Sequence, residues 1–371
     1  MGDRRALWQT RVPQHLWVEI AARYMGLPSP ACAADTGKPL GAAASIPSVR
    51  QRTIDIHGDA LTSAQIQGDH WRQVHHDPIK RKVAALARRY GDTPVQVEPS
   101  ELFTCVLHNN AQHLTHARQN VVRSRIAVGR RVGGDRITPD ILIRRVSDGT
   151  GASNDMLYDI KGLHRAPAVA TQHPFYYRTS HEGDDACHAV NARAREVHAQ
   201  YVSECRRRDA EFFGTPATTV GPFLARLRQF PDVVGLVFGT FAEASQGVHT
   251  LVESLAKAAA PAWMAHLGAA NEKQAKALLK HRITEDLGVE AARSQADLLI
   301  TRLGHYRRVH AGVPSRDLHT APEAAVAGDR DDGMAAGGVH LGYGAALERH
   351  DRLAFDAISV VGAPGILVGG P

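Results

Sequence analysis

The stretch TPDILIRRVSDGTGASNDMLYDIK, residues 138–161, decides the fold class because it places charged residues inside two apolar runs. Asp140 follows a proline and opens the run DILIRRV, and Asp159 and Lys161 lie within the run MLYDIKGL. A cluster of Gly, Ser and Asp over residues 147–155 separates the two runs, which is typical of a turn between strands. The sequence therefore predicts two neighbouring strands that carry two acids and a lysine.

The alternation of side chains along a strand groups these charges. Residues two apart share a face, so Asp159 and Lys161 point the same way, and Asp140 lies beside that face if the two strands pair. Two carboxylates about 4 Å apart repel by roughly 4 kcal/mol at an effective dielectric near 20, and a divalent cation relieves this cost. Mg²⁺ prefers carboxylates, water and phosphate oxygens. The pattern therefore favours phosphodiester hydrolysis, with Asp140 and Asp159 as metal ligands and Lys161 orienting the attacking water. A solvated strand face with Asp140 as a turn residue is the alternative interpretation.

Composition narrows the class of protein. The chain has 371 residues, of which 43% are hydrophobic, enough for a sizeable core. Its 44 basic residues outnumber 38 acidic ones, which favours a polyanionic partner only mildly. Four widely spaced cysteines argue against a disulfide framework or a zinc module. No run suits a secretory signal or a membrane span, so we expect an intracellular protein that is not secreted and not in a membrane.

Apolar spacing predicts helices on both sides of the strands. A short helix precedes Gly26, and a second begins at Asp77, which we expect to cap it, and ends at Gly91. The further helices expected are residues 187–212 and 243–267, and the strands expected are 95–98, 140–146, 156–163 and 233–241. The order helix, strand, strand, strand, helix, strand predicts an α/β fold with a mixed sheet flanked by helices.

The same patterns divide the chain into regions. The expected regions are an N-terminal helix and loop-rich part (1–70), a core (71–268), a helical hairpin broken at Gly288 (269–310) and a Gly- and Ala-rich disordered tail (311–371).

These motifs resemble the PD-(D/E)XK nuclease superfamily, whose core runs α-β-β-β-α-β with Pro-Asp on the second strand and acid-x-Lys on the third. The closer resemblance is to the restriction-like endonuclease region that follows the reverse transcriptase in site-specific non-LTR retrotransposons. It covers roughly residues 55–265. The corresponding stretches are HGDALTS (57–63), QVHHDPIKRKVAALARRYG (73–91), VEP (97–99), TPDILI (138–143), YDIK (158–161) and AREVHAQY (194–201). The resemblance implies a restriction-endonuclease-like core, cleavage of DNA with Mg²⁺ or Mn²⁺, and the nucleus as one location.

The chain departs from this family at several positions. The helix after Asp77 lacks the Glu or Gln of many members, so the third acid is Asp77, Glu98 or missing. The relatives' Arg-His pair is here His75 and His76. HGDALTS has no cysteine, which argues against an upstream zinc knuckle, and without a polymerase portion the chain would be a detached or decayed fragment.

Basic and aromatic residues are the candidates for nucleic-acid contact. The basic flank of the helix 187–212 suits backbone phosphates, although a solvated helix face is an equal alternative. The candidates are Arg193, Arg195, Tyr201 and His76. Two other functions stay open: a catalytically inactive nucleic-acid-binding remnant of the same fold, and a helical scaffold unrelated to nucleases.

Overall fold

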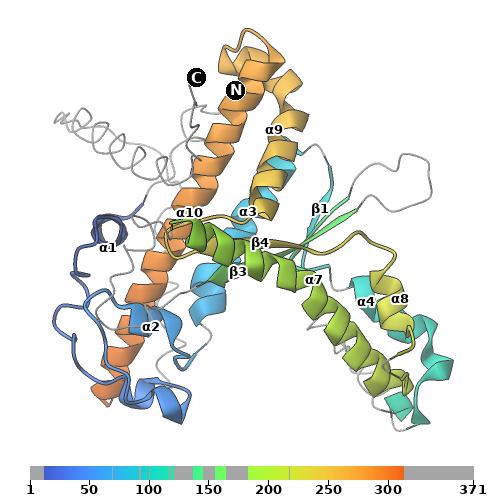
Figure 1. The fold of residues 1–371 in the computed structure, drawn as a ribbon, viewed down its shortest axis with the longest axis horizontal. Coiled ribbons are helices and arrows are strands. Elements are labelled where there is room, and N and C mark those ends of the chain that lie inside the picture. Colours follow the sequence, from blue (N-terminus) through green and yellow to red (C-terminus); the bar gives the residue numbers. More distant parts are fainter. Residues whose placement is uncertain are drawn as a thin grey trace, which may run out of the picture. The chain divides into compact units, whose positions relative to one another are not determined.

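A computed structural model describes the chain over residues 12–68, 70–91, 93–99, 101–116, 118–120, 137–144, 155–163, 183–216 and 218–312 (Figure 1). The chain divides into two compact units. Unit 1 comprises Met1–Val74, His164–Phe175 and Arg293–Pro371, and unit 2 comprises His75–Leu163 and Tyr176–Ala292. The tail expected to be disordered lies outside the described residues from residue 313 onward.

Unit 2 is built on a four-stranded mixed sheet with the strand order β1-β2-β3-β4. The strands are β1 (Val95–Val97), β2 (Ile141–Ile143), β3 (Met156–Leu163) and β4 (Val234–Gly239). β1, β2 and β3 pair antiparallel in turn, and β4 joins β3 in parallel after the long helix α7 (Gly183–Phe213). A parallel neighbour requires such a crossover. The mixed sheet flanked by helices and the pairing of β2 with β3 are therefore confirmed.

Helices cover both faces of this sheet (Figure 1). One face packs against α3 (Asp77–Tyr90), α9 (Gln246–Leu267) and the first part of α10 (Glu272–His310). The other packs against α7, α8 (Pro222–Leu227) and α4 (Glu101–Asn109). α4 is not among the helices that the apolar spacing predicts. Alternating residues of β3 divide between the faces, because Tyr158 and Ile160 join the first core and Leu157 the second.

Close packing of α7 over the sheet fixes the helix that reaches the candidate site. A Cβ built on Gly235 of β4 would lie 2.8 Å from the Val197 side chain and 2.9 Å from the Ala194 backbone. Any larger residue at this position would therefore push α7 away from the sheet. The sequence meets the requirement with glycine, so α7 lies close enough for its Tyr201 to reach β3.

The expected hairpin over 269–310 is wrong, because α10 is one continuous helix through Gly288. The apolar stripe of Leu279, Ile283 and Leu287 stays buried in the core of unit 2 across this position. A glycine inside a helix costs only about 1 kcal/mol, less than the burial of several apolar side chains provides. The segment before Ala292 is therefore part of the core and not a separate element.

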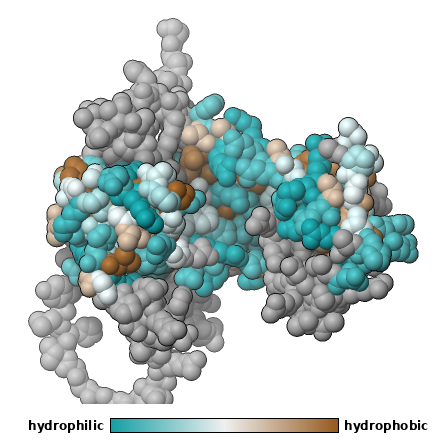
Figure 2. Space-filling view, turned by 90° about the horizontal axis from the view of Figure 1, so that it is seen from below, coloured by the Kyte–Doolittle hydropathy of each residue, from teal (hydrophilic) through white to brown (hydrophobic). Residues whose placement is uncertain are grey.

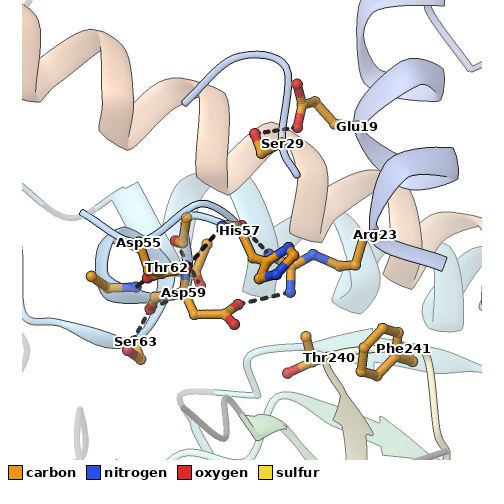
Figure 3. A network of polar contacts seen from close by, with 12 residues as sticks. Glu19, Arg23, Ser29, Asp55, His57, Asp59, Thr62, Ser63, Thr240 and Phe241 are labelled. Carbon is orange, nitrogen blue, oxygen red and sulfur yellow. Dashed lines mark hydrogen bonds and ion pairs between the residues drawn. The ribbon is translucent and has the colours of Figure 1, made fainter. Parts of the chain in front are cut away.

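Unit 1 contains more regular structure than expected. The first helix is confirmed as α1 (Gln14–Met25), ended by Gly26 in the left-handed conformation. The rest of the part expected to be rich in loops also contains α2 (Asp59–Ser63) and short 3₁₀ turns. Figure 3 shows the polar contacts that hold this region together, among them Asp55 at the start of α2.

On the face shown in Figure 2, hydrophobic residues form small areas between hydrophilic ones. Each helix in the described ranges is too short or too polar to cross a lipid bilayer.

Candidate metal and catalytic site

Three acids lie in one row across three neighbouring strands, with Glu98 and Asp140 one residue beyond β1 and β2 and Asp159 within β3. Ile141 of β2 lies opposite Tyr158 of β3, so the next pair outward is Asp140 opposite Asp159. On the other side, the backbone N–H of Glu98 donates to the carbonyl of Asp140 at 2.8 Å and continues the β1–β2 ladder by one residue. The strands therefore bring Asp140 and Asp159 together, as the sequence predicted.

Asp140 is fixed from two sides. Its Oδ2 accepts the backbone N–H of Ile160 at 2.7 Å and lies 3.0 Å from Nε2 of His76. Burial raises the pKa of Asp140, but the hydrogen bond and charge of His76, together with the Ile160 amide, outweigh it and lower the pKa below 3.8. Asp140 therefore stays ionised although only 8% of the residue is exposed.

The pKa of Asp159 shifts in the opposite direction from that of Asp140. Burial and the neighbouring charge of Asp140 raise its pKa to about 6, even though the Lys161 ammonium lowers it. Lys161 Nζ lies 2.7 Å from Asp159 Oδ2, and the Tyr201 hydroxyl donates to Asp159 Oδ1 at 3.2 Å. The two buried carboxylates thus repel one another, and Asp159 is the one that holds a proton more tightly.

His76 stands between two acids. Its Nε2 faces Asp140 and its Nδ1 lies 3.0 Å from Asp77 Oδ1. A doubly protonated ring satisfies both contacts, since each nitrogen then donates. Burial lowers the pKa of His76, but the hydrogen bonds and charges of Asp140 and Asp77 outweigh it and raise the pKa above 6.5.

The expected helix cap at Asp77 is wrong. His76 occupies the N-cap position of α3, where no side chain makes a capping hydrogen bond, and a π-helical turn (Trp71–His76) precedes it. The Asp77 carboxylate instead contacts His76 and Lys80, with Lys80 Nζ at 2.7 Å. Such π-helical turns are frequent at functional sites, and here the turn leads directly into the cluster.

Lys80 is the residue that sequence reasoning missed. Its ammonium lies 2.7 Å from Asp77 Oδ1 and 2.5 Å from Glu98 Oε1, and only 4% of the residue is exposed. The available signal was a lysine beside Ile79 and Val83, in the buried stripe of α3. A lysine in such a stripe needs an acidic partner, but the sequence does not say which acid.

The residues expected to contact nucleic acid divide into two groups. Tyr201 and His76 are buried beside the carboxylates, so they are better placed to hold those acids than to contact a polymer. Arg193 and Arg195 lie on α7, with Arg195 exposed and Arg193 paired with Glu196 at 2.8 Å. Further along α7, Arg207 and Arg208 pair with Glu204 and Glu211. These ion pairs thus offset part of the positive charge on the basic flank of α7.

The carboxylates of Asp140 and Asp159 suit a hard cation, to which the described part of the chain offers few other ligands. Asp159 Oδ2 is buried and accepts no hydrogen bond within the described ranges, apart from its ion pair with Lys161. The same ranges contain no group of three or more His, Cys, Asp and Glu arranged to hold one metal ion. A cation here would therefore depend on two carboxylates together with water and substrate oxygens, a ligand set that Mg²⁺ commonly has.

No family model, curated protein or solved structure matches this chain.

Proposed function

We propose that this protein is a Mg²⁺- or Mn²⁺-dependent nuclease that hydrolyses phosphodiester bonds of DNA. One observation carries the proposal: Asp140, directly before β2, lies opposite Asp159 of β3, and the Lys161 ammonium contacts Asp159. A purely structural role gains nothing from two adjacent buried carboxylates, because the repulsion costs stability. A site that binds a cation gains the ligands it needs.

The element order supports a restriction-endonuclease-like core. α3, β1, β2, β3, α7 and β4 follow the order α-β-β-β-α-β, with α4 and α8 as additional helices. Asp140 directly precedes β2, and Asp159 and Lys161 lie in β3, as in the family that the motifs resemble.

Each side chain has a distinct role in the proposed reaction. Asp140 and Asp159 would hold the metal, which when bound would neutralise phosphoryl oxygens and acidify a bound water. Lys161, whose side chain is 30% exposed, can reach a substrate phosphate and offset the charge that develops on it. Tyr201 fixes Asp159 by a hydrogen bond, and His76 fixes Asp140.

Nicking of supercoiled plasmid DNA tests the proposal. We expect the full chain to nick DNA with Mg²⁺ or Mn²⁺ and to stop on addition of EDTA. Asp159→Asn should lower the rate by at least about 100-fold, the usual cost of removing one group that stabilises the transition state. Asp232→Asn, an exposed acid in the same unit, serves as the matched control. Equal rates for wild type and Asp159→Asn would refute the proposed mechanism.

A catalytically inactive nucleic-acid-binding protein is the second candidate. The small number of metal ligands from the described residues and the burial of both carboxylates favour it. Such a protein would bind DNA with an affinity that falls steeply as salt is added, and would not cleave it with either metal. A filter-binding assay across a salt series, run beside the nicking assay, separates the two candidates.

A further inference from the structure

The third acid of the site has two candidates, Asp77 and Glu98, and the Lys80 ammonium contacts both of them. Glu98 continues the strand row by its backbone but leaves the strand conformation, with φ at 48°. A non-glycine residue in this left-handed region is strained and needs a compensating contact. The Glu98 carboxylate makes that contact with Lys80 on α3.

Asp77 is engaged in the same way. One oxygen, Oδ1, faces both His76 Nδ1 at 3.0 Å and Lys80 Nζ at 2.7 Å. The Lys80 ammonium therefore lies between Asp77 and Glu98 and neutralises part of the charge of both. Breaking a contact with a buried ammonium is costly, and 5% of the Lys80 side chain is exposed, so Asp77 and Glu98 are poor metal ligands. The ammonium that contacts Asp159 differs in this respect, because 30% of the Lys161 side chain is exposed.

We propose that Lys80 withholds Asp77 and Glu98 from the metal, and that His76 is a positioning residue that orients Asp140, so that Asp140 and Asp159 hold the ion without a third acid. This inference rests on the proposed function. Alternating charges connect the residues involved, from Glu98 through Lys80, Asp77 and His76 to Asp140. The arrangement resembles the outer contacts of many metal sites, where a second residue fixes the orientation of each ligand.

Carboxamide variants distinguish an acid that binds the metal from an acid that only contacts Lys80. In Glu98→Gln and Asp77→Asn, the remaining oxygen can still accept the hydrogen bond from Lys80. The contact with Lys80 is therefore kept, while the negative charge that a metal ligand needs is lost. Manganese binding to the full chain, measured by the EPR signal of free Mn²⁺, reports affinity without any need for cleavage. We expect both variants to bind Mn²⁺ within about threefold of wild type, and Asp159→Asn to bind about 100-fold more weakly or not at all.

His76 is tested in the same titration. His76→Leu removes the contact with Asp140 and should weaken Mn²⁺ binding by about 10- to 100-fold, and His76→Gln, which keeps a donor, should recover part of the loss. Thermal melting without metal is measured in parallel. A merely structural role would lower the melting temperature of His76→Leu and leave the Mn²⁺ affinity of the folded protein unchanged, which would overturn the positioning role.

The outcomes also distinguish this inference from the proposed function. Wild-type protein that binds Mn²⁺ while Glu98→Gln or Asp77→Asn weakens binding as much as Asp159→Asn would overturn the inference alone, because that acid would then be a ligand. Wild-type protein that neither binds Mn²⁺ nor nicks DNA would overturn the proposed function and the inference together.

Discussion

Acids in the two units have different surroundings, and the difference separates a structural role from a functional one. In unit 1, Asp55 accepts the backbone N–H groups of His57, Asp59 and Ala60 at 2.9, 3.1 and 2.6 Å (Figure 3). Glu19 accepts the Ser29 hydroxyl at 2.6 Å in the same way. In unit 2, by contrast, burial and the like charge of Asp140 raise the pKa of Asp159 to about 6.

The comparison shows what each kind of acid does for the fold. An acid that accepts backbone N–H groups satisfies donors that would otherwise cost free energy, so it stabilises the unit in which it lies. An acid placed beside another acid lowers the stability of the metal-free protein, and a chain retains it where it binds something. Substitutions in the two units should therefore have opposite effects on stability.

The largest effect is expected for Asp55→Ala in unit 1. The change leaves three backbone N–H groups without their acceptor, which should lower the free energy of unfolding by about 3 to 5 kcal/mol. Denaturant melts followed by circular dichroism measure this, with the exposed Glu272→Gln as the control. Mn²⁺ affinity of the folded variant should stay at the wild-type value, and a change of less than 1 kcal/mol in stability would contradict a structural role for Asp55.

Asp159→Asn in unit 2 is expected to raise the free energy of unfolding, whereas Asp55→Ala lowers it. The pKa of Asp159 is 3.8 ordinarily and about 6 in the folded protein, so the ionised form costs stability above pH 6 and nothing below pH 3.8. The variant should gain up to about 3 kcal/mol in unfolding free energy at pH 8, at 1.36 kcal/mol per pKa unit, and gain nothing at pH 3.5. Denaturant melts at these two pH values check the sign. A variant that is less stable than wild type at pH 8 would show that Lys161 more than offsets the repulsion.

A smaller effect is expected for Tyr201→Phe. The hydroxyl is shared between Asp159 Oδ1 and the carbonyl of Thr138, at 3.2 and 3.3 Å. Its loss should cost about 1 kcal/mol in stability and raise the pKa of Asp159 further, because a donor to the ionised form is removed. Chemical denaturation and an NMR titration of the Asp159 carboxyl measure the two consequences. A lower pKa in the variant would contradict the assigned hydrogen bond.

The smallest effect is expected on the basic flank of α7. Arg207 is half exposed and paired with Glu204 and Glu211, so Arg207→Gln should change the unfolding free energy by less than about 0.5 kcal/mol. Arg195→Gln, at an exposed residue of α7, tests nucleic-acid binding instead. If Arg195 contacts phosphate, its removal should reduce the salt dependence of DNA binding by about one counterion.

Local pattern was enough to predict the centre of the site. The period of two in MLYDIKGL placed Asp159 and Lys161 on one face, and the turn cluster before it implied pairing with the strand after Asp140. Both follow from neighbours in sequence, so no knowledge of the rest of the fold was needed. β2 and β3 pair as expected, and the structure adds the register, which the sequence does not determine.

The partners of the acids could not be predicted, because they come from elements distant in sequence. Tyr201 reaches Asp159 only because α7 packs closely against β4 at Gly235, and Lys80 meets Glu98 only because that residue leaves the strand at a positive φ. The continuity of α10 through Gly288 was missed for a related reason: the tertiary burial of its stripe outweighs the low helix propensity of glycine. These contacts depend on packing, which a local pattern does not contain.

The central claim is that Asp140 and Asp159 share one buried site that binds a divalent cation. The most direct measurement is a carbon-detected NMR titration of the aspartate carboxyls, with and without Mg²⁺, in the wild type and in Asp140→Asn to assign the coupling. Without metal, the account predicts that Asp159 titrates near pH 6, and that its pKa falls when Mg²⁺ is added or when Asp140 loses its charge. An Asp159 carboxyl that titrates near its ordinary 3.8 and does not respond to Mg²⁺ or to Asp140→Asn would contradict the claim.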